Sequence, residues 1–195
     1  MSNKTLNLNP GDIILYRSTK KLSIGKAIQF FMKRYLKKLG IKKDIVYNHS
    51  ATIINLYDRI FVGEALGKGI TISPFDETYA NKLDKIKILT PKKVYSKLEK
   101  EKINKVVLSY VLKPTRYDFL NFWYQIKMIL NTTKKGNKDW DGPTGKKATK
   151  RMYCTEASAT WANEIRSNTF EDPWSINPVD IDLNKYYKVV YNGVE

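Results

Sequence analysis

The sequence contains a single cysteine, Cys154, and a single histidine, His49. With one thiol the chain cannot form an internal disulfide, so nothing in it marks an oxidising compartment. One cysteine and one histidine far apart in sequence make no recognisable zinc-binding set. Phosphate-binding glycine loops and the Gly-x-Ser-x-Gly elbow of serine hydrolases are also missing. The sequence therefore predicts no metal and no cofactor.

Long apolar segments are missing too. No run approaches the roughly 18 residues that a membrane span needs, and the first six residues, Met1 to Leu6, lack the apolar core of a secretory signal. We therefore expect no transmembrane segment and a cytoplasmic location, with release by lysis or in a phage setting as the alternative.

Acidic residues are few: 19 Asp and Glu stand against 35 Lys and Arg, a formal net charge of +16. Such a charge suits an anionic surface or polymer. However, lysine greatly outnumbers arginine and asparagine is abundant, a pairing that an AT-rich genome produces without selection for binding. Arginine is the preferred residue for planar phosphate recognition. Specific nucleic-acid binding is therefore not expected.

The pattern of apolar residues predicts one α+β domain over residues 1–195. At this length, with 42% hydrophobic residues, the chain can bury a substantial core. Periodicity and turn residues indicate the elements. We expect strands near 11–17, 47–56, 59–66, 70–73, 86–89 and 185–191, and helices near 23–39, 96–113, 117–130 and 154–163.

The densest strand signal is an antiparallel hairpin that contains His49. If Tyr57 and Asp58 form a two-residue turn, Ala51 lies opposite Glu64, and His49 and Glu64 are diagonal neighbours on one face. A three-residue loop would move Glu64 to the opposite face. The register thus decides whether a carboxylate can reach the imidazole.

Cys154 stands directly before a helical pattern in which Ala157, Trp161 and Ala162 share one side. A helix N-terminus favours a thiolate through its free N–H groups and dipole. We interpret Cys154 and His49 as nucleophile and general base. The alternative is a buried structural cysteine and an incidental histidine.

Two segments look like additions to a minimal core. Residues 24–44 form a basic amphipathic helix, which either lies on an anionic membrane or, the favoured interpretation, docks its apolar stripe on the domain. Residues 131–151 form a Lys/Gly-rich loop that leads into Cys154. It is either a solvated surface loop or a rim that admits anionic substrate.

Five short motifs occur in a known order: Gly11-Asp12-Ile13-Ile14, Asn48-His49-Ser50-Ala51, Val62-Gly63-Glu64-Ala65, Tyr153-Cys154-Thr155-Glu156 and Pro178-Val179-Asp180. This order resembles the circularly permuted, papain-like NlpC-type cysteine amidohydrolases, the group that includes YiiX- and YebB-like proteins. In that group the histidine strand precedes the cysteine helix, as it does here. The resemblance covers nearly the whole chain.

The resemblance implies a permuted papain-like fold, with an antiparallel sheet or half-barrel packed against the nucleophile helix. It also implies roles for individual residues. Cys154 matches the nucleophile, His49 the base and Glu64 the residue that orients the imidazole. Glu156 matches a frequent acid of the family or serves only the helix N-terminus, and Tyr16 is expected to line the cleft.

The implied activity is that of a thiol hydrolase that cleaves a peptide or γ-glutamyl amide through a thioester, with cell-wall peptidoglycan as the default substrate class. Lipid-directed acyltransferases of this fold carry Asn-Cys-Glu-His around the nucleophile, which Tyr153-Cys154-Thr155-Glu156 does not match. The acyltransferase remains an alternative because of the basic helix. A non-catalytic basic module that binds an anionic polymer or membrane is the other.

Overall fold

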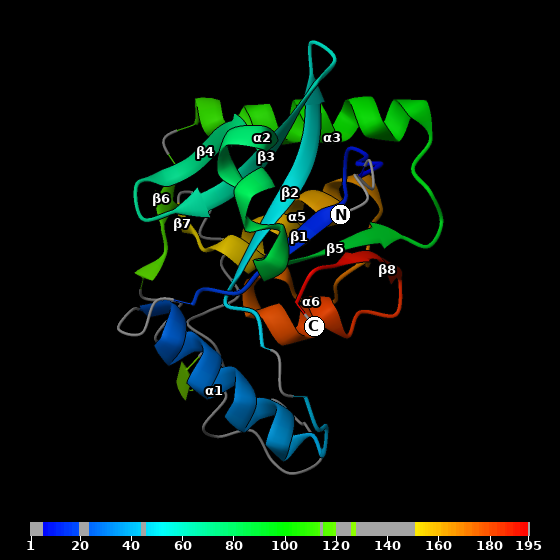
Figure 1. Ribbon diagram of the computed structural model, residues 1–195. Helices are drawn as coiled ribbons and strands as arrows, with labels where there is room; N and C mark the ends of the chain where they lie inside the picture. The colour runs from blue at the N-terminus through cyan, green and yellow to red at the C-terminus, as the bar shows by residue number, and fades with distance from the viewer. Residues whose placement is uncertain are drawn as a thin grey trace.

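The computed structural model describes residues 6–19, 24–43, 46–113, 115–119, 126–127 and 151–194. These residues form an α+β fold in which one antiparallel sheet is packed against helices (Figure 1). The elements are β1 (Ile13–Tyr16), α1 (Ile24–Lys38), β2 (His49–Leu56), β3 (Arg59–Leu66), β4 (Gly69–Pro74), α2 (Phe75–Thr78), the 3-10 helix η1 (Ala80–Lys85), β5 (Ile86–Pro91), α3 (Lys97–Leu112), β6 (Arg116–Tyr117), β7 (Arg151–Met152), α5 (Cys154–Ile165), η2 (Pro173–Ser175), α6 (Pro178–Asp182) and β8 (Tyr187–Asn192).

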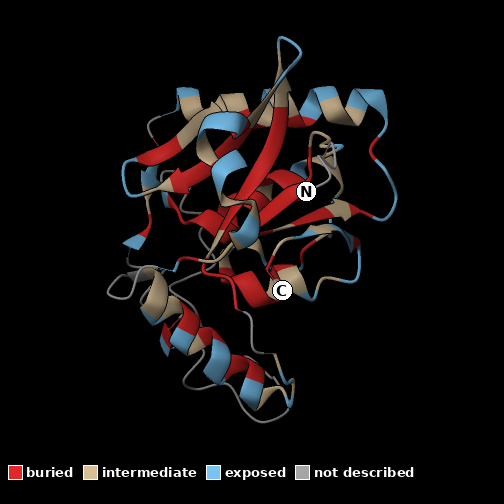
Figure 2. Ribbon diagram, in the orientation of Figure 1, coloured by how far each residue is buried: buried red, intermediate tan, exposed pale blue. Residues whose placement is uncertain are grey.

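The main sheet has the strand order β4-β3-β2-β1-β5-β8, and every neighbouring pair is antiparallel. Its two faces carry different parts of the core. Ala51 and Ile53 pack with Phe75 and Tyr79 on the α2 side, whereas Ile54 packs with residues of α3 and α5 on the other. Buried residues concentrate in the central strands and α5 (Figure 2).

The β2–β3 hairpin has the predicted two-residue turn. Thr52 pairs with Gly63 and Leu56 with Arg59. Tyr57 and Asp58 have φ values of 50° and 59°, the left-handed pair that a type I′ turn requires. Continuing this register puts Glu64 beside Ala51, diagonal to His49, so the predicted register is confirmed.

Gly63 lets two helices approach the sheet. A Cβ atom there would lie 2.5 Å from Cγ1 of Val107 on α3 and 3.4 Å from the Trp161 ring on α5. Val107 and Trp161 are both fully buried. Because real Cβ contacts are longer than 3.0 Å, glycine at this position allows α3 and α5 to pack directly on β3.

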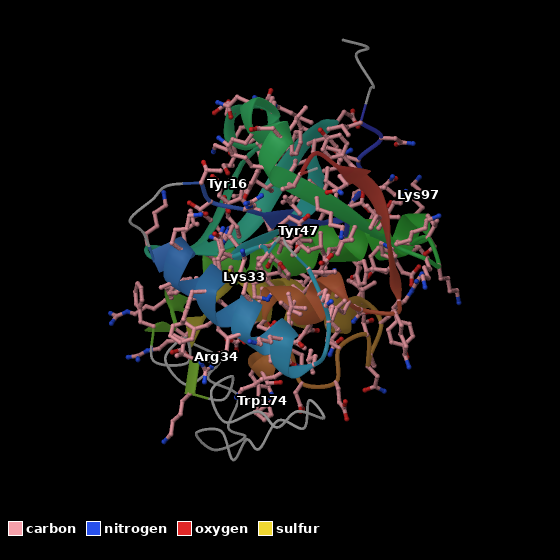
Figure 3. All side chains as sticks on the ribbon, turned by 60° about the horizontal axis from the view of Figure 1, so that its bottom comes forward. Tyr16, Lys33, Arg34, Tyr47, Lys97 and Trp174 are labelled. Atoms are coloured by element: carbon pink, nitrogen blue, oxygen red, sulfur yellow. The ribbon has the colours of Figure 1, made fainter. Side chains whose placement is uncertain are left out.

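Helix α1 docks on the domain, as the favoured interpretation expected. Met32, Tyr35 and Leu36 are buried against Val46 and against Val179 of α6. The expected stop at Gly40 is also present: Gly40 has φ 73°, and the N–H of the following residue donates to the Leu36 carbonyl at 3.0 Å. Lys33 and Arg34 lie on the exposed side of the helix (Figure 3).

One expected element differs. The helix predicted from Tyr117 to Leu130 does not begin at Tyr117, because Arg116 and Tyr117 form strand β6, which pairs in parallel with β7. The partner strand lies far along the chain, so local apolar periodicity gave no sign of it. Most of residues 120–130, and residues 131–150 of the predicted Lys/Gly-rich loop, lie outside the described residues.

Candidate active site

His49 and Glu64 are in direct contact. His49 is the first residue of β2 and Glu64 lies near the end of β3, so the hairpin brings them to the same end of the sheet. Nε2 of His49 and Oε2 of Glu64 are 2.6 Å apart. Tyr79 donates its hydroxyl to the same carboxylate oxygen at 3.0 Å. The imidazole is thereby held by a buried carboxylate that is itself held in place.

Cys154, the first residue of α5, meets His49. Its thiol lies within hydrogen-bonding reach of the imidazole, and the backbone N–H groups of Ser50 and Thr155 also point to the sulfur. The site thus joins the first residue of β2, β3 and the first residue of α5, with the imidazole contacting both the thiol and the carboxylate.

These contacts shift the pKa values of the pair in opposite directions. Burial alone raises the pKa of the Cys154 thiol, but the charge of His49 and the hydrogen bonds to the sulfur lower it overall. Burial lowers the pKa of His49, and the charges of Cys154 and Glu64 reverse this and raise it to about 10. Both shifts favour the thiolate–imidazolium form of the pair over the neutral form.

The carboxylate behind the imidazole stays ionised. Burial raises the pKa of Glu64, but the hydrogen bond and charge of His49 lower it overall. The pKa of Tyr79 is raised well above its usual value by burial and by the neighbouring Glu64 charge. Tyr79 is therefore a neutral hydrogen-bond donor to a charged acceptor, which is the stronger kind of hydrogen bond.

The start of α5 is fixed from several sides. Ser50 and Ser158 join β2 to α5 through hydroxyl groups 3.0 Å apart. Thr155 and Tyr153 both donate their hydroxyl groups to the carbonyl of Ile176, at 2.6 and 2.8 Å. These buried contacts hold the nucleophile candidate at one position relative to the imidazole.

Glu156 has a structural contact at the helix start. Its Oε2 accepts the backbone N–H of Tyr153 at 3.4 Å, and a carboxylate in the first turn favours the helix dipole. This agrees with the second of the two interpretations of Glu156, support for the helix N-terminus.

Tyr16 lies beside His49. The two are paired across β1 and β2, and the Tyr16 ring meets the Tyr79 ring edge-on with centroids 6.0 Å apart. Lys82 places its ammonium group 6.0 Å from the Tyr16 ring and 5.6 Å from the Tyr79 ring. Tyr16 thus belongs to the surroundings of the imidazole and its carboxylate.

Tyr117 contacts Cys154 and was not expected at the site. Its hydroxyl lies within hydrogen-bonding reach of both the thiol and the backbone N–H of Cys154. Burial, together with the Cys154 charge, raises the pKa of Tyr117, so the phenol is neutral. Cys154 itself is only 5% exposed. Tyr117 also lines a cavity of about 310 Å³.

Tyr79 and Tyr117 could not be recognised as site residues from sequence patterns. Tyr79 follows a single helical turn, α2, and Tyr117 lies in a strand of two residues. Neither stands in an extended periodic pattern. The chain has 13 tyrosines, and residue type alone does not distinguish these two from the others. Only the tertiary structure shows that they lie near Cys154 and Glu64.

No family model matches the sequence, and no curated protein matches it. Among solved structures the chain is similar to that of YiiX from Escherichia coli O157:H7, a protein described as a metalloprotein. The TM-score is 0.57 and the identity 14%, over 96% of this chain and 98% of that chain. Such a likeness concerns the fold alone.

Fold and site together define an α+β protein in which a buried cysteine and a buried glutamate contact a largely buried histidine. Its architecture is YiiX-like, which agrees with the resemblance noted in the sequence at the level of the fold. No helix in the described part of the chain has the length and apolar character needed to cross a bilayer.

Proposed function

We propose that the protein is a thiol hydrolase of the permuted papain-like type, which cleaves a peptide or γ-glutamyl amide bond. The observation that carries the proposal is the buried contact of His49 with both Cys154 and Glu64, together with the lowered pKa of the thiol. A single cysteine used only for packing needs neither an imidazole nor a carboxylate behind it.

In the proposed reaction the Cys154 thiolate attacks the amide carbonyl carbon and a tetrahedral oxyanion forms. His49 then gives its proton to the leaving amine as the C–N bond breaks, which leaves a thioester on Cys154. A water molecule attacks the thioester while His49 accepts its proton. The acid is released and the thiolate and imidazolium are restored.

Two groups would stabilise the oxyanion in this reaction. The backbone N–H of Cys154 lies at the head of α5, where the helix dipole favours negative charge. The neutral Tyr117 hydroxyl stands beside that N–H and is a second hydrogen-bond donor. Glu64 keeps the imidazole oriented and stabilises its charged form.

A metal centre is the other chemistry to test, because the YiiX structure is described as that of a metalloprotein. Among the residues that the structure describes, no group of three or more His, Cys, Asp or Glu side chains could hold a metal ion. The donor set around Cys154 and His49 does not fit a metal, and no step is assigned to one.

The test compares the wild-type protein with Cys154→Ser and His49→Gln on peptide and γ-glutamyl anilides. We expect both variants to fold, by circular dichroism, and to lose roughly 1,000-fold or more of the hydrolysis rate. Wild-type labelling by iodoacetamide should titrate well below the free-cysteine pKa of about 8.5. Hydrolysis retained by Cys154→Ser, or labelling with an ordinary thiol pKa, would contradict the proposal.

A further inference from the structure

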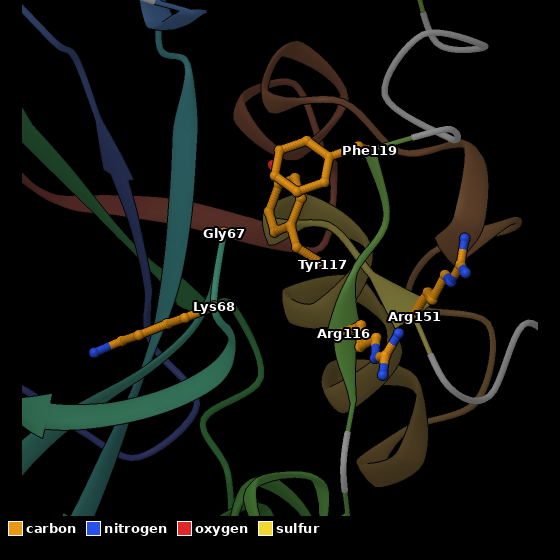
Figure 4. Close-up of a pocket in the computed structure, with 6 residues that line it drawn as sticks. All are labelled: Gly67, Lys68, Arg116, Tyr117, Phe119 and Arg151. Atoms are coloured by element: carbon orange, nitrogen blue, oxygen red, sulfur yellow. The ribbon is translucent and has the colours of Figure 1, made fainter.

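The cavity beside Cys154 is lined by three basic residues. Its lining residues are Gly67, Lys68, Arg116, Tyr117, Phe119 and Arg151 (Figure 4). The cavity adjoins the proposed nucleophile in two ways. Tyr117 touches both, and Arg151 precedes Cys154 by three residues, a span of at most about 10 Å of extended chain.

The two arginines lie side by side. Arg116 and Arg151 are paired positions of the parallel β6–β7 ladder, so their backbones are about 4.8 Å apart. Both residues are exposed, whereas Met152, next along β7, is buried. Figure 4 shows both arginine side chains on the same side of the cavity, while Lys68 extends away from them.

Within the described residues neither arginine forms an ion pair or hydrogen bond. Like charges placed opposite each other on a ladder destabilise it. The basic composition of the chain does not explain this pair, because that composition comes from lysine and arginine is scarce. Two guanidinium groups carried by paired positions can together offer several planar N–H donors to an oxygen anion.

We infer that the cavity binds a carboxylate of the substrate, held by Arg116 and Arg151 close to the bond that Cys154 attacks. This inference rests on the proposed function and narrows its substrate class to amides that carry a free carboxylate near the scissile bond. The two arginines act as specificity-determining residues and take no part in bond breaking.

The test measures the alkylation of Cys154 by two small reagents of nearly the same shape, anionic iodoacetate and neutral iodoacetamide. The imidazolium of His49 attracts iodoacetate in every variant, so the informative quantity is the change in the iodoacetate-to-iodoacetamide rate ratio. We expect Arg116→Gln and Arg151→Gln each to lower that ratio roughly 2- to 5-fold at low salt.

Arg34→Gln is the matched control, since it removes the same charge from the exposed side of α1. Its ratio should equal that of the wild type. In a second arm, succinate should protect Cys154 from iodoacetate in the wild type and protect it less in both cavity variants. Protection by glycerol phosphate but not by succinate would overturn the assignment to a carboxylate.

The outcomes separate the two proposals. Fast labelling by both reagents, with a ratio unchanged in Arg116→Gln and Arg151→Gln, would overturn the carboxylate site and leave the thiol hydrolase standing. Slow labelling by both reagents, as for an ordinary cysteine, would overturn the hydrolase and the carboxylate site with it.

Discussion

At the scale of single residues, His49 has the most demanding position. Its imidazole is only 16% exposed and has a negative group on either side, and its raised pKa results from their combined charge acting against the cost of burial. Glu64 supplies part of that charge from 2.6 Å away. Replacing this carboxylate by a neutral amide of the same shape should therefore change the pKa of the imidazole.

Glu64→Gln should lower the pKa of His49 by about one unit or more, because an opposite charge at this distance typically shifts a pKa by that amount. His49 is the only histidine, so one imidazole signal in an NMR titration reports it without ambiguity. Glu77→Gln, which makes the same change at a carboxylate 67% exposed, is the control. An unshifted midpoint in Glu64→Gln would show that the carboxylate does not support the imidazolium.

Glu64→Gln should also change how the free energy of unfolding depends on pH. A group whose pKa is lowered by folding, as that of Glu64 is, contributes stability above its unfolded value of about 4.5 that is lost as the pH falls through the folded value. The free energy of unfolding of the wild type should therefore fall more steeply on acidification than that of Glu64→Gln. Chemical denaturation at several pH values below about 5 measures this.

At the scale of elements, the proposed nucleophile is positioned by how α5 meets the sheet. Gly63 allows both α3 and α5 to lie against β3, and Val107 is the side chain that a larger residue would strike first. Since Trp161 on α5 packs on the same spot, a change at Gly63 acts on the helix that carries Cys154.

Gly63→Ala should lower the free energy of unfolding by about 1–3 kcal/mol through overpacking. Val107→Ala removes the methyl group that the new Cβ would meet. In the double variant the two effects should be non-additive, with the pair less destabilised than the sum by roughly 0.5–2 kcal/mol. Urea denaturation of the four proteins measures the cycle, and strict additivity would show that the two positions are not in contact.

Much at this scale was predictable from sequence. The hairpin register followed from Tyr57-Asp58, and the helix starting at Lys97 followed from the Ser96–Glu99 capping box, which is present. Both are local patterns. The β6–β7 pairing is not, because it joins positions far apart in the chain, so Tyr117 was wrongly assigned to a helix.

The same distinction applies to the site. The contact of His49 with Glu64 follows from hairpin geometry, whereas the meeting of Cys154 with His49 was inferred from their chemistry as the single cysteine and histidine, and then from the resemblance. Tyr79, Tyr117 and the arginine pair depend on tertiary packing alone. The roles of Cys154, His49 and Glu64, and the two additions at 24–44 and 131–151, stay predictions.

At the scale of the whole molecule, α1 projects from the sheet and is tied back to it (Figure 1). Asp182, at the end of α6, binds Lys43 beyond α1 at 2.5 Å and Lys87 on β5 at 2.6 Å. Its side chain is only 5% exposed. This carboxylate therefore joins three parts of a chain whose net charge of +16 otherwise repels itself.

Asp182→Asn should destabilise the protein by about 1.5–3 kcal/mol, the usual loss for hydrogen bonds to a charged group. Amide hydrogen exchange in residues 24–38 should accelerate, since Lys43 loses its anchor. Asp84→Asn removes the same negative charge at an exposed position and is the control for the change in net charge. Unchanged exchange in α1 would show that the Lys43–Asp182 pair does not hold the helix.

The β6–β7 ladder has one more consequence. The chain departs from it after Tyr117 and returns at Arg151, at neighbouring positions about one strand spacing apart. Parallel strands need a crossover of a dozen or more residues, so an insertion can lengthen this connection without stretching the sheet, whereas a short turn cannot replace it. Engineered versions can therefore be lengthened there, next to the arginines, while the cysteine, histidine and glutamate keep their places.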